Sequence, residues 1–273
     1  MDKRKIAILG CGFMAKAIVR GLIEKKIFPA ESIIIINEHN LASAEVLAAS
    51  CGARSGGAEA IAGADAAMIC FKPQSFVQAM PEYARHMHAG QLLISIMAGI
   101  AISDISAVLP EGVEVMRAMP NLALSVGMSA TGYAAGAGVS DENRALCAEI
   151  FSSLGVADEV PEADICGVTA LSGSGPAYFY YLAECMIEAA VSAGMDRAAA
   201  QRLCKQTFVG TAELWKNDAA PPEEMRRRIT SAKGTTDAAI KAMTAAGLPG
   251  AVAEGMQACR ARSDEMGREM LNK

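Results

Sequence analysis

Residue types that commonly carry catalysis are scarce in this chain. Its 273 residues include 3 histidines and 1 tryptophan, and aromatic side chains make up 5% of the total. The 8 cysteines form no C-x-x-C pair and have no histidine nearby at zinc-ligand spacing. Such cysteines are typical of buried apolar positions in a reducing compartment. We therefore expect no metal site.

Long apolar runs and basic patches are also lacking. No segment reaches the roughly 18 uninterrupted apolar residues that a membrane-spanning helix requires. The net charge is -5, and Lys and Arg are scattered apart from the short run at 226–228, which leaves no basic face for a phosphate backbone. We expect neither a membrane nor a nucleic acid as a partner.

The N-terminus imitates a secretory signal, because basic residues precede an apolar stretch and Ala15-Lys16-Ala17 resembles a cleavage site. The alternative is a strand that runs into a glycine turn. Cleavage would delete that turn, which is the strongest motif in the chain, so we favour the strand. A cytoplasmic protein is expected.

The first part of the chain alternates short apolar runs with helical patterns. Ile, Val and Met dominate the runs, which fits strands that are covered on both faces by crossover helices. The runs are 5–9, 33–36, 66–71, 92–97 and 113–118. We predict an α/β fold whose residues 1–162 form a doubly wound, Rossmann-type dinucleotide-binding domain with a parallel sheet.

Residues 163–273 are expected to form an all-helical domain for dimerisation and substrate binding. A long helix over 176–193 is hydrophobic around most of its circumference, which predicts that a second copy of the chain covers it. We expect a homodimer through these helices, with a larger assembly left open. Further helix starts are signalled by Asp196, Pro221 and Pro222, Thr235 or Thr236, and Pro249.

The motif Gly10-Cys11-Gly12-Phe13-Met14-Ala15 follows the first strand and opens a helix. Gly10 permits a tight turn, Gly12 lets a pyrophosphate approach the backbone, and small Ala15 allows close helix packing. The alternative is an ordinary strand-to-helix turn. The following strand runs favour nucleotide binding.

The end of the second strand bears on the choice between NAD and NADP. Asn37 there favours NADP, whereas Glu38 would repel a 2'-phosphate, and His39 could help only when protonated. Two further strand ends, Phe71-Lys72-Pro73 and the segment with Met97-Ala98, are expected to face a cofactor. A surface lysine at Lys72 is an equally ordinary interpretation.

Two glycine-containing segments follow. The segment 169–177 (T-A-L-S-G-S-G-P-A) is typical of a close-approach site and also of a domain hinge, and the two interpretations are compatible. The segment 229–237 (I-T-S-A-K-G-T-T-D) runs into a helix start that suits a small carboxylate, although plain capping is the simpler interpretation.

Taken together and in this order, these motifs resemble the pyrroline-5-carboxylate reductase family over essentially the whole chain. The resemblance rests on K-P-Q (72–74), M-P-N (119–121), S-G-S-G-P-A-Y (172–178) and G-T-T (234–236). It implies hydride transfer from NADPH, less often NADH, to the C=N carbon of 1-pyrroline-5-carboxylate, which yields L-proline in the last step of proline biosynthesis.

The resemblance also implies site residues. Thr169 would orient or protonate the imine nitrogen. Ser231, Gly234, Thr235 and Thr236 would hold the substrate carboxylate. The cofactor would be lined by Leu9, Gly10, Cys11, Gly12, Phe13, Met14, Asn37, Phe71, Lys72, Pro73, Met97 and Ala98.

The chain departs from the family pattern at three places. Leu122-Ala123 stands where the family usually has Thr-Pro, Gly127-Met128-Ser129 replaces Gly-Glu-Gly, and Lys233 replaces the first of two loop glycines. A positive φ at Lys233 would cost about 1 kcal/mol or more. These departures keep two alternatives open: a reductase of a related cyclic imine carboxylate, and a non-catalytic dinucleotide-binding sensor. A β-hydroxyacid dehydrogenase is disfavoured, because the 176–193 helix carries no lysine.

Overall fold

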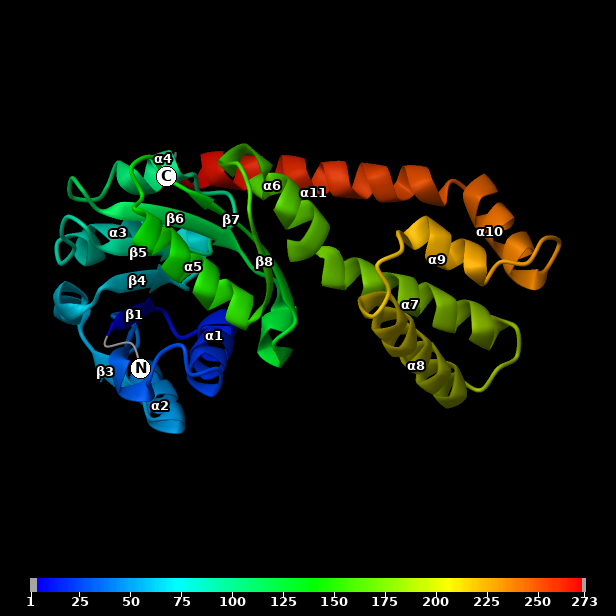
Figure 1. Cartoon of the computed structure of the whole chain (residues 1–273), viewed down its shortest axis with the longest axis horizontal. Helices are drawn as coiled ribbons and strands as arrows, with labels where there is room; N and C mark the ends of the chain where they lie inside the picture. The colour runs from blue at the N-terminus through cyan, green and yellow to red at the C-terminus, as the bar shows by residue number, and fades with distance from the viewer. Residues whose placement is uncertain (1–3, 272–273) are drawn as a thin grey trace. The chain divides into compact units, whose positions relative to one another are not determined.

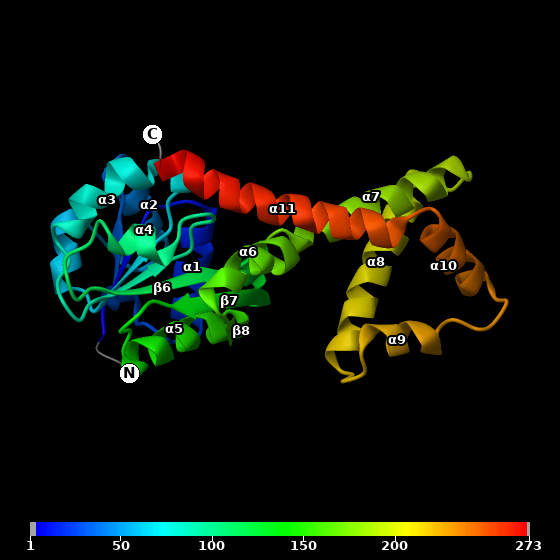
Figure 2. The same cartoon turned by 90° about the horizontal axis from the view of Figure 1, so that it is seen from above.

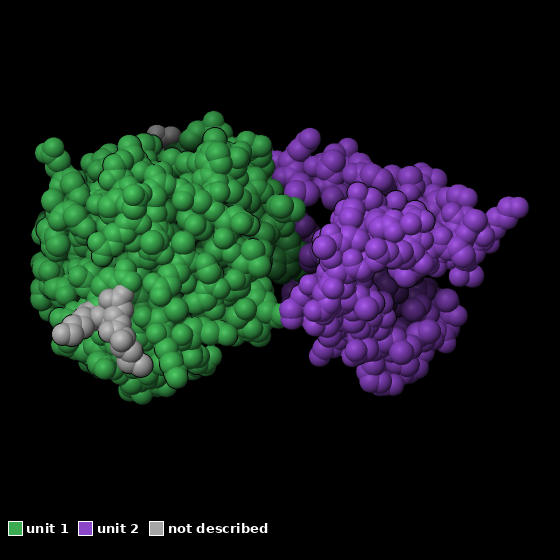
Figure 3. All heavy atoms as spheres, viewed as in Figure 1, with its two compact units in different colours: residues 1–176, 258–273 green, residues 177–257 purple. Residues whose placement is uncertain are grey.

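The computed structural model describes residues 4–271, which form two compact units (Figure 3). The first unit runs to Pro176 and takes up the chain again from Ala258, and the second unit is Ala177–Gln257. This division does not coincide with the expected boundary at 162/163, which stays a prediction. None of the described helices is long and apolar enough to cross a membrane.

An eight-stranded sheet organises the first unit, in the order β3-β2-β1-β4-β5-β6-β7-β8 (Figure 1). All neighbouring strands are parallel except β6 and β7. The strands are β1 (Ile6–Leu9), β2 (Ile33–Ile36), β3 (Arg54–Gly56), β4 (Ala66–Ile69), β5 (Leu92–Ser95), β6 (Glu114–Met119), β7 (Ser129–Ala135) and β8 (Gly155–Glu159). The order reverses at β1, as in doubly wound nucleotide-binding sheets, so the expected fold class is confirmed.

Helices cover both faces of the sheet, which explains why its inner strands are apolar on both sides. One face is covered by α1 (Phe13–Glu24), α2 (Leu41–Cys51) and α5 (Asp141–Ser153). The other face is covered by α3 (Phe76–Ala84), α4 (Ile102–Ser106) and α6 (Ile165–Val168) (Figure 2). Each of β1, β2, β4 and β5 is buried at every position.

Three strands were not expected from the sequence. β3 and β8 lie at the two edges of the sheet and are mostly exposed or half-buried. β7 is built largely from Ser, Ala, Thr and Gly. The five expected runs match β1, β2, β4, β5 and β6, because only these strands carry the continuous apolar pattern of a doubly covered sheet.

The last helix, α11 (Leu248–Leu271), returns the chain to the first unit. Gly99 has a φ of 81°, and a Cβ there would lie 2.8 Å from the Ser263 carbonyl oxygen and 2.9 Å from the Gly267 nitrogen. A Cβ on Gly267 would lie 1.9 Å from the Gly99 carbonyl oxygen. Two glycines therefore allow the loop after β5 to contact the backbone of α11.

The second unit consists of helices, as expected. They are α7 (Gly175–Ser192), which begins in the first unit, then α8 (Arg197–Lys216), α9 (Pro222–Arg228), α10 (Thr235–Ala245) and the start of α11. The Asp196 carboxylate caps α8 by accepting the Ala199 N–H. The expectation that a threonine caps α10 is wrong: Gly234 occupies that position without a side-chain cap.

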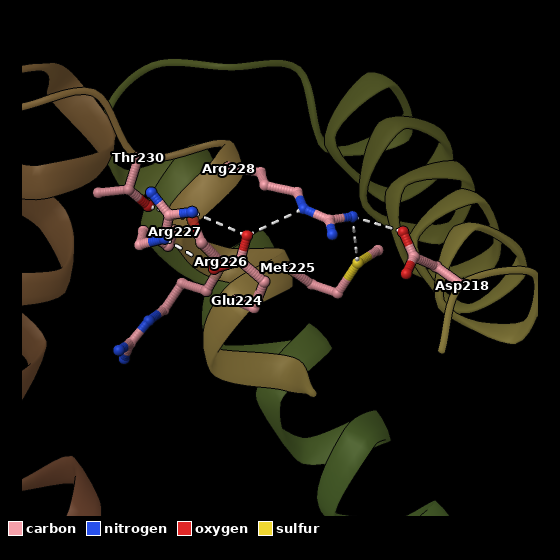
Figure 4. Close-up of polar contacts among 7 residues, drawn as sticks. All are labelled: Asp218, Glu224, Met225, Arg226, Arg227, Arg228 and Thr230. Atoms are coloured by element: carbon pink, nitrogen blue, oxygen red, sulfur yellow. Dashed lines mark hydrogen bonds and ion pairs between the residues drawn. The ribbon is translucent and has the colours of Figure 1, made fainter. Parts of the chain in front are cut away.

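The basic run at 226–228 does not form a free cationic face. Arg227 and Arg228 both pair with Glu224, three and four residues earlier on α9, and Arg228 also contacts Asp218 (Figure 4). Such i,i+3 and i,i+4 pairs are typical of exposed helix surfaces. The second unit thus compensates the charges of Arg227 and Arg228 locally.

Candidate functional site

The glycine turn after β1 has the geometry that a dinucleotide site requires. Gly10 has a φ of 113°, and a Cβ there would lie 3.0 Å from the Phe71 nitrogen. Gly12 begins α1 with no side-chain cap, and a Cβ there would meet only the Cys70 carbonyl oxygen, at 3.9 Å. No acidic residue occupies the first turn of α1. The helix N-terminus is therefore open to an anion.

The other expected cofactor segments lie, like the glycine turn, at the carboxyl ends of the parallel strands. The Gly10 N–H donates to the Ile36 carbonyl at the end of β2, and the Cys70 N–H donates to the Leu9 carbonyl. The Ile96 N–H donates to the Ile69 carbonyl, which joins the ends of β5 and β4. Ligands of open α/β sheets bind outside these carboxyl ends.

The strand end at Phe71-Lys72-Pro73 is partly ordered by aromatic packing. The Phe71 ring stacks on Tyr83 with centroids 5.9 Å apart. Burial raises the pKa of the Tyr83 hydroxyl and of the Cys70 thiol, so both remain protonated at neutral pH. Lys72 is exposed and caps a short turn that begins at Pro73. Met97 is buried and Ala98 is half-buried.

The two polar residues after β2 each have a structural partner. Asn37 Nδ2 donates to Ser43 Oγ over 2.8 Å. Glu38 Oε1 accepts the Ala58 N–H over 2.7 Å. The Glu38 carboxylate, which would repel a 2'-phosphate, is thus hydrogen-bonded to the backbone at the start of the turn Ala58–Gly63.

Thr169 begins a π-helical turn, Thr169–Gly173, between α6 and α7. Its side chain is buried at 8% exposure, and Oγ1 donates to the Ile165 carbonyl over 2.9 Å. The Thr169 carbonyl accepts the Ser174 N–H at 2.8 Å, five residues on. π turns of this kind are frequent at functional sites.

A buried polar cluster beside this turn was not identified as functional from the sequence. Asn121 Nδ2 donates to the Ser172 carbonyl over 3.0 Å, and the Asn121 N–H donates to Ser129 Oγ over 3.1 Å. Ser129 Oγ and Thr131 Oγ1 lie 3.0 Å apart. The only sequence signal for this cluster is the M-P-N motif.

The expected carboxylate-binding residues lie in the second unit, in the loop before α10. The Gly234 N–H donates to the Ser231 carbonyl, and a Cβ on Gly234 would lie 2.4 Å from Ser231 Oγ. Lys233 has a φ of 60°, so the residue that replaces a family glycine does take the strained left-handed conformation. Its N–H donates to Asp237 Oδ2, which also accepts from Lys241 Nζ.

The first amides of α10, those of Thr235 and Thr236, have no intrahelical acceptor and no side-chain cap at Gly234. Thr236 is half-buried, and Thr235 and Ser231 are exposed. The structure therefore groups Ser231, Gly234, Thr235 and Thr236 within one loop. Thr169 and the cofactor segments belong to the first unit. Within residues 4–271, no three His, Cys, Asp or Glu side chains are grouped so that they could hold a metal ion.

Two family models match the chain. One, described as pyrroline-5-carboxylate reductase dimerisation, matches residues 162–266. The other, described as NADP oxidoreductase coenzyme F420-dependent, matches residues 5–99.

Curated relatives and solved structures match the chain from end to end. The pyrroline-5-carboxylate reductase of Methanosarcina acetivorans is 33% identical over 98% of this chain and 100% of its own length. That of Pseudomonas aeruginosa is 34% identical over 99% of this chain and 99% of its own length. A pyrroline-5-carboxylate reductase structure from Coxiella burnetii has a TM-score of 0.89 at 29% identity, over 97% of this chain and 98% of that one. The Plasmodium falciparum enzyme, crystallised with NADP bound, has a TM-score of 0.85 at 24% identity, over 98% of this chain and 99% of that chain.

Proposed function

The chain belongs to the pyrroline-5-carboxylate reductase family, and from this membership we propose that it reduces 1-pyrroline-5-carboxylate to L-proline. The reaction adds a hydride to the carbon of the C=N bond and a proton to its nitrogen, and it oxidises the reduced nicotinamide. It is the last step of proline biosynthesis. The observation that carries the proposal is the Gly10–Gly12 turn after β1, where the strand order of the sheet reverses. A glycine turn at this point of a doubly wound sheet is typical of dinucleotide binding.

The residues at the sheet edge fit a pyridine nucleotide. The proposed cofactor contacts are Leu9, Gly10, Cys11, Gly12, Phe13, Met14, Asn37, Phe71, Lys72, Pro73, Met97 and Ala98. When bound, the reduced nicotinamide supplies the hydride. The uncapped N-terminus of α1 supports a role in binding the pyrophosphate.

We propose that NADPH is preferred over NADH. Asn37 carries no charge that would repel a 2'-phosphate. Glu38 Oε1 accepts the Ala58 N–H, so part of the hydrogen-bonding capacity of this carboxylate is used within the protein rather than on a ribose 2'-hydroxyl. An acidic residue free to accept that hydroxyl is the usual device for selecting NAD.

Thr169 is the proposed catalytic residue. Its hydroxyl proton is directed to the Ile165 carbonyl, so the oxygen lone pairs are left to accept a hydrogen bond. A protonated imine offers an N–H to such an acceptor. This geometry supports orientation of the iminium by Thr169 rather than proton donation from it.

The substrate carboxylate is proposed to bind at the start of α10, through Ser231, Gly234, Thr235 and Thr236. The amides of Thr235 and Thr236 lack intrahelical acceptors, and the helix dipole favours a negative charge there. The absence of a side-chain cap at Gly234 supports this role.

The helices of the second unit are proposed to form a homodimer, with a larger assembly left open. The match of residues 162–266 to the dimerisation model and the exposed apolar faces of α7 and α8 support the dimer. A cytoplasmic location is also proposed, since all eight cysteines are free thiols and a reducing compartment keeps them so.

A related cyclic imine carboxylate is the second candidate substrate, and the strained Lys233 beside the carboxylate loop favours it. The experiment is the loss of reduced-nicotinamide absorbance with 1-pyrroline-5-carboxylate, run with NADPH and NADH in parallel, with L-proline quantified. We expect turnover that is faster with NADPH. Cofactor binding without turnover on this imine would overturn the proposal in favour of a shifted substrate or a sensor.

A further inference from the structure

The start of α7 contains a backbone break that the fold must compensate. In an α-helix, each carbonyl accepts the N–H four residues further on. Position 176, four residues after Ser172, is a proline and has no N–H. The Ser172 carbonyl, on a half-buried residue, therefore needs a donor from outside the helix.

Asn121 supplies that donor. Its Nδ2 lies 3.0 Å from the Ser172 carbonyl oxygen. Asn121 directly follows β6 and Pro120, at the end of the M-P-N motif, and its side chain is buried with the residue at 8% exposure. The hydrogen bond from Asn121 to Ser172 thus links the end of β6 to the π turn Thr169–Gly173, which precedes α7. A proline lies near each end of this bond, Pro120 beside Asn121 and Pro176 four residues after Ser172.

The side chain of Asn121 is fixed in the orientation that this bond requires. Its Oδ1 accepts the Ala123 N–H over 3.0 Å, so Nδ2 is the end that is left for Ser172. The Asn121 N–H donates to Ser129 Oγ over 3.1 Å, and Ser129 is itself 2% exposed. A donor held on both sides in this way is pre-organised rather than adaptable.

The bonded carbonyl belongs to the π turn that carries Thr169. Ser172 lies within Thr169–Gly173, and the turn closes through the Ser174 N–H and the Thr169 carbonyl at 2.8 Å. A Cβ on Gly173 would lie 3.7 Å from Met119 Cγ and 3.8 Å from Thr169 Cγ2. The end of β6 and Thr169 therefore pack on the same glycine.

We propose that Asn121 is a positioning residue: it holds the Ser172 carbonyl that Pro176 leaves unbonded, and so fixes the π turn that orients Thr169 toward the imine nitrogen. This inference rests on the proposed function and extends it to a residue outside the proposed cofactor and carboxylate contacts. Displacing Thr169 by a fraction of an ångström is expected to slow hydride transfer, because the reaction depends on alignment.

A double-mutant cycle of Asn121→Ala and Thr169→Val tests the link. We expect Asn121→Ala to lower kcat about 10- to 100-fold, with the KM for NADPH within about 2-fold of wild type. Since Asn121 acts through Thr169, the double variant should be no slower than Thr169→Val alone. Multiplicative losses in the double variant would overturn the proposal.

A rescue variant separates positioning from general destabilisation. Pro176→Ala restores an N–H four residues after Ser172, so Asn121→Ala/Pro176→Ala should regain at least about 3-fold in kcat over Asn121→Ala. A double variant as slow as Asn121→Ala would overturn the role of this carbonyl. Asn143→Ala is the matched control, because Asn143 lies on α5 of the same unit and its Nδ2 also donates to another residue, Glu114 Oε2, over 2.7 Å. This variant should keep wild-type kcat.

The two proposals fail differently. If wild-type protein does not reduce 1-pyrroline-5-carboxylate, the proposed function fails. Thermal unfolding first shows whether Asn121→Ala is folded. If the wild-type protein is active and the folded variant keeps wild-type kcat, only the role of Asn121 fails.

Discussion

Phe28, Phe76 and Phe151 in the first unit are each at most 2% exposed, whereas Phe179, Tyr180 and Tyr181 in the second unit are 61%, 71% and 69% exposed. The first unit has a sheet whose two faces are each covered by helices of the same unit. The second unit has helices and no sheet, and α7 has Gly175 as its sole buried residue. Only the first unit completes its own core.

This difference teaches what each unit needs in order to fold. Burying an aromatic side chain contributes about 1.5–3 kcal/mol relative to leaving it exposed. The first unit gains this contribution within one chain. The second unit gains this burial free energy only when another surface covers α7. The match of residues 162–266 to a dimerisation family model indicates that a second copy of the chain provides that surface.

The largest expected effect is a charge placed on α7. Tyr180→Asp should dissociate the dimer and lower the melting temperature of the second unit, because a buried unpaired carboxylate costs several kcal/mol. The control is Val46→Asp on α2, since Val46 is also 71% exposed. Light scattering should give a lower mass for the first variant and the mass of the wild-type oligomer for the second. Equal masses for the two variants would refute the assignment of α7 to an interface.

The next largest effect tests the first unit alone. Gly10→Ala forces a Cβ to within about 3.0 Å of the Phe71 nitrogen at a positive φ, so the Kd for NADPH should rise at least about 10-fold. The dimer mass should not change. Gly63→Ala is the control, because a Cβ there meets no atom within 4 Å. Tight binding by Gly10→Ala would remove the glycine turn from the cofactor site.

A smaller effect is expected in the second unit. Thr236→Ala should raise the KM for 1-pyrroline-5-carboxylate by about 10-fold and leave the KM for NADPH nearly unchanged, because it removes the side-chain hydroxyl from the proposed carboxylate site while keeping the backbone N–H. Thr244→Ala, on the same helix with its hydroxyl bonded to the Ile240 carbonyl, should change neither constant. Equal increases in both constants for Thr236→Ala would exclude it from the carboxylate site.

Among residues 4–271, each unit contains one lysine with a φ of 60°, Lys26 in the first and Lys233 in the second. Glycine at either position should stabilise its unit by about 0.5–1 kcal/mol, because relief of the left-handed strain exceeds the entropic cost of glycine. Thermal unfolding measures this change. Lys233→Gly should also keep or raise activity with 1-pyrroline-5-carboxylate. A large loss of activity would mean that Lys233 contacts the substrate.

The smallest effect depends on pH. Burial raises the pKa of Glu114, but hydrogen bonds from Ser140 and Asn143 outweigh it and leave the pKa below its ordinary value. The stabilisation is therefore present above about pH 4.3, the unfolded value, and is lost as pH falls through the lower folded pKa. Glu114→Gln should flatten the acid dependence of the melting temperature of the first unit. An unchanged acid dependence would show that Glu114 does not contribute.

Much of the first unit could be predicted from the sequence because its central strands are covered on both faces. Such strands carry uninterrupted Ile, Val and Leu, as in β2. β3, β7 and β8 could not be predicted, because exposed edges and small residues produce no apolar run. The return of α11 could not be predicted either, since its sequence signal is the pair Gly99 and Gly267, which lie far apart in the chain.

The candidate site was predictable where backbone geometry dictates residue type, as at Gly10 and Gly234. The strain at Lys233 could be anticipated only as a condition on its φ. The role of Asn121 was hidden because its bond to the Ser172 carbonyl compensates for Pro176, and the two positions lie 55 residues apart. Sequence spacing alone gives no sign of such a long-range backbone partner.

Hydrogen exchange, measured by mass spectrometry on wild-type protein and on Tyr180→Asp, tests the contrast between the two units most directly. In wild type, we expect the amides of α7 and α8 to be protected together with those of β1, β4 and β5. In Tyr180→Asp, α7 and α8 should lose protection while the three strands keep theirs. Unchanged protection of α7 and α8 in a monomeric variant would contradict the account, as would loss of protection in the strands.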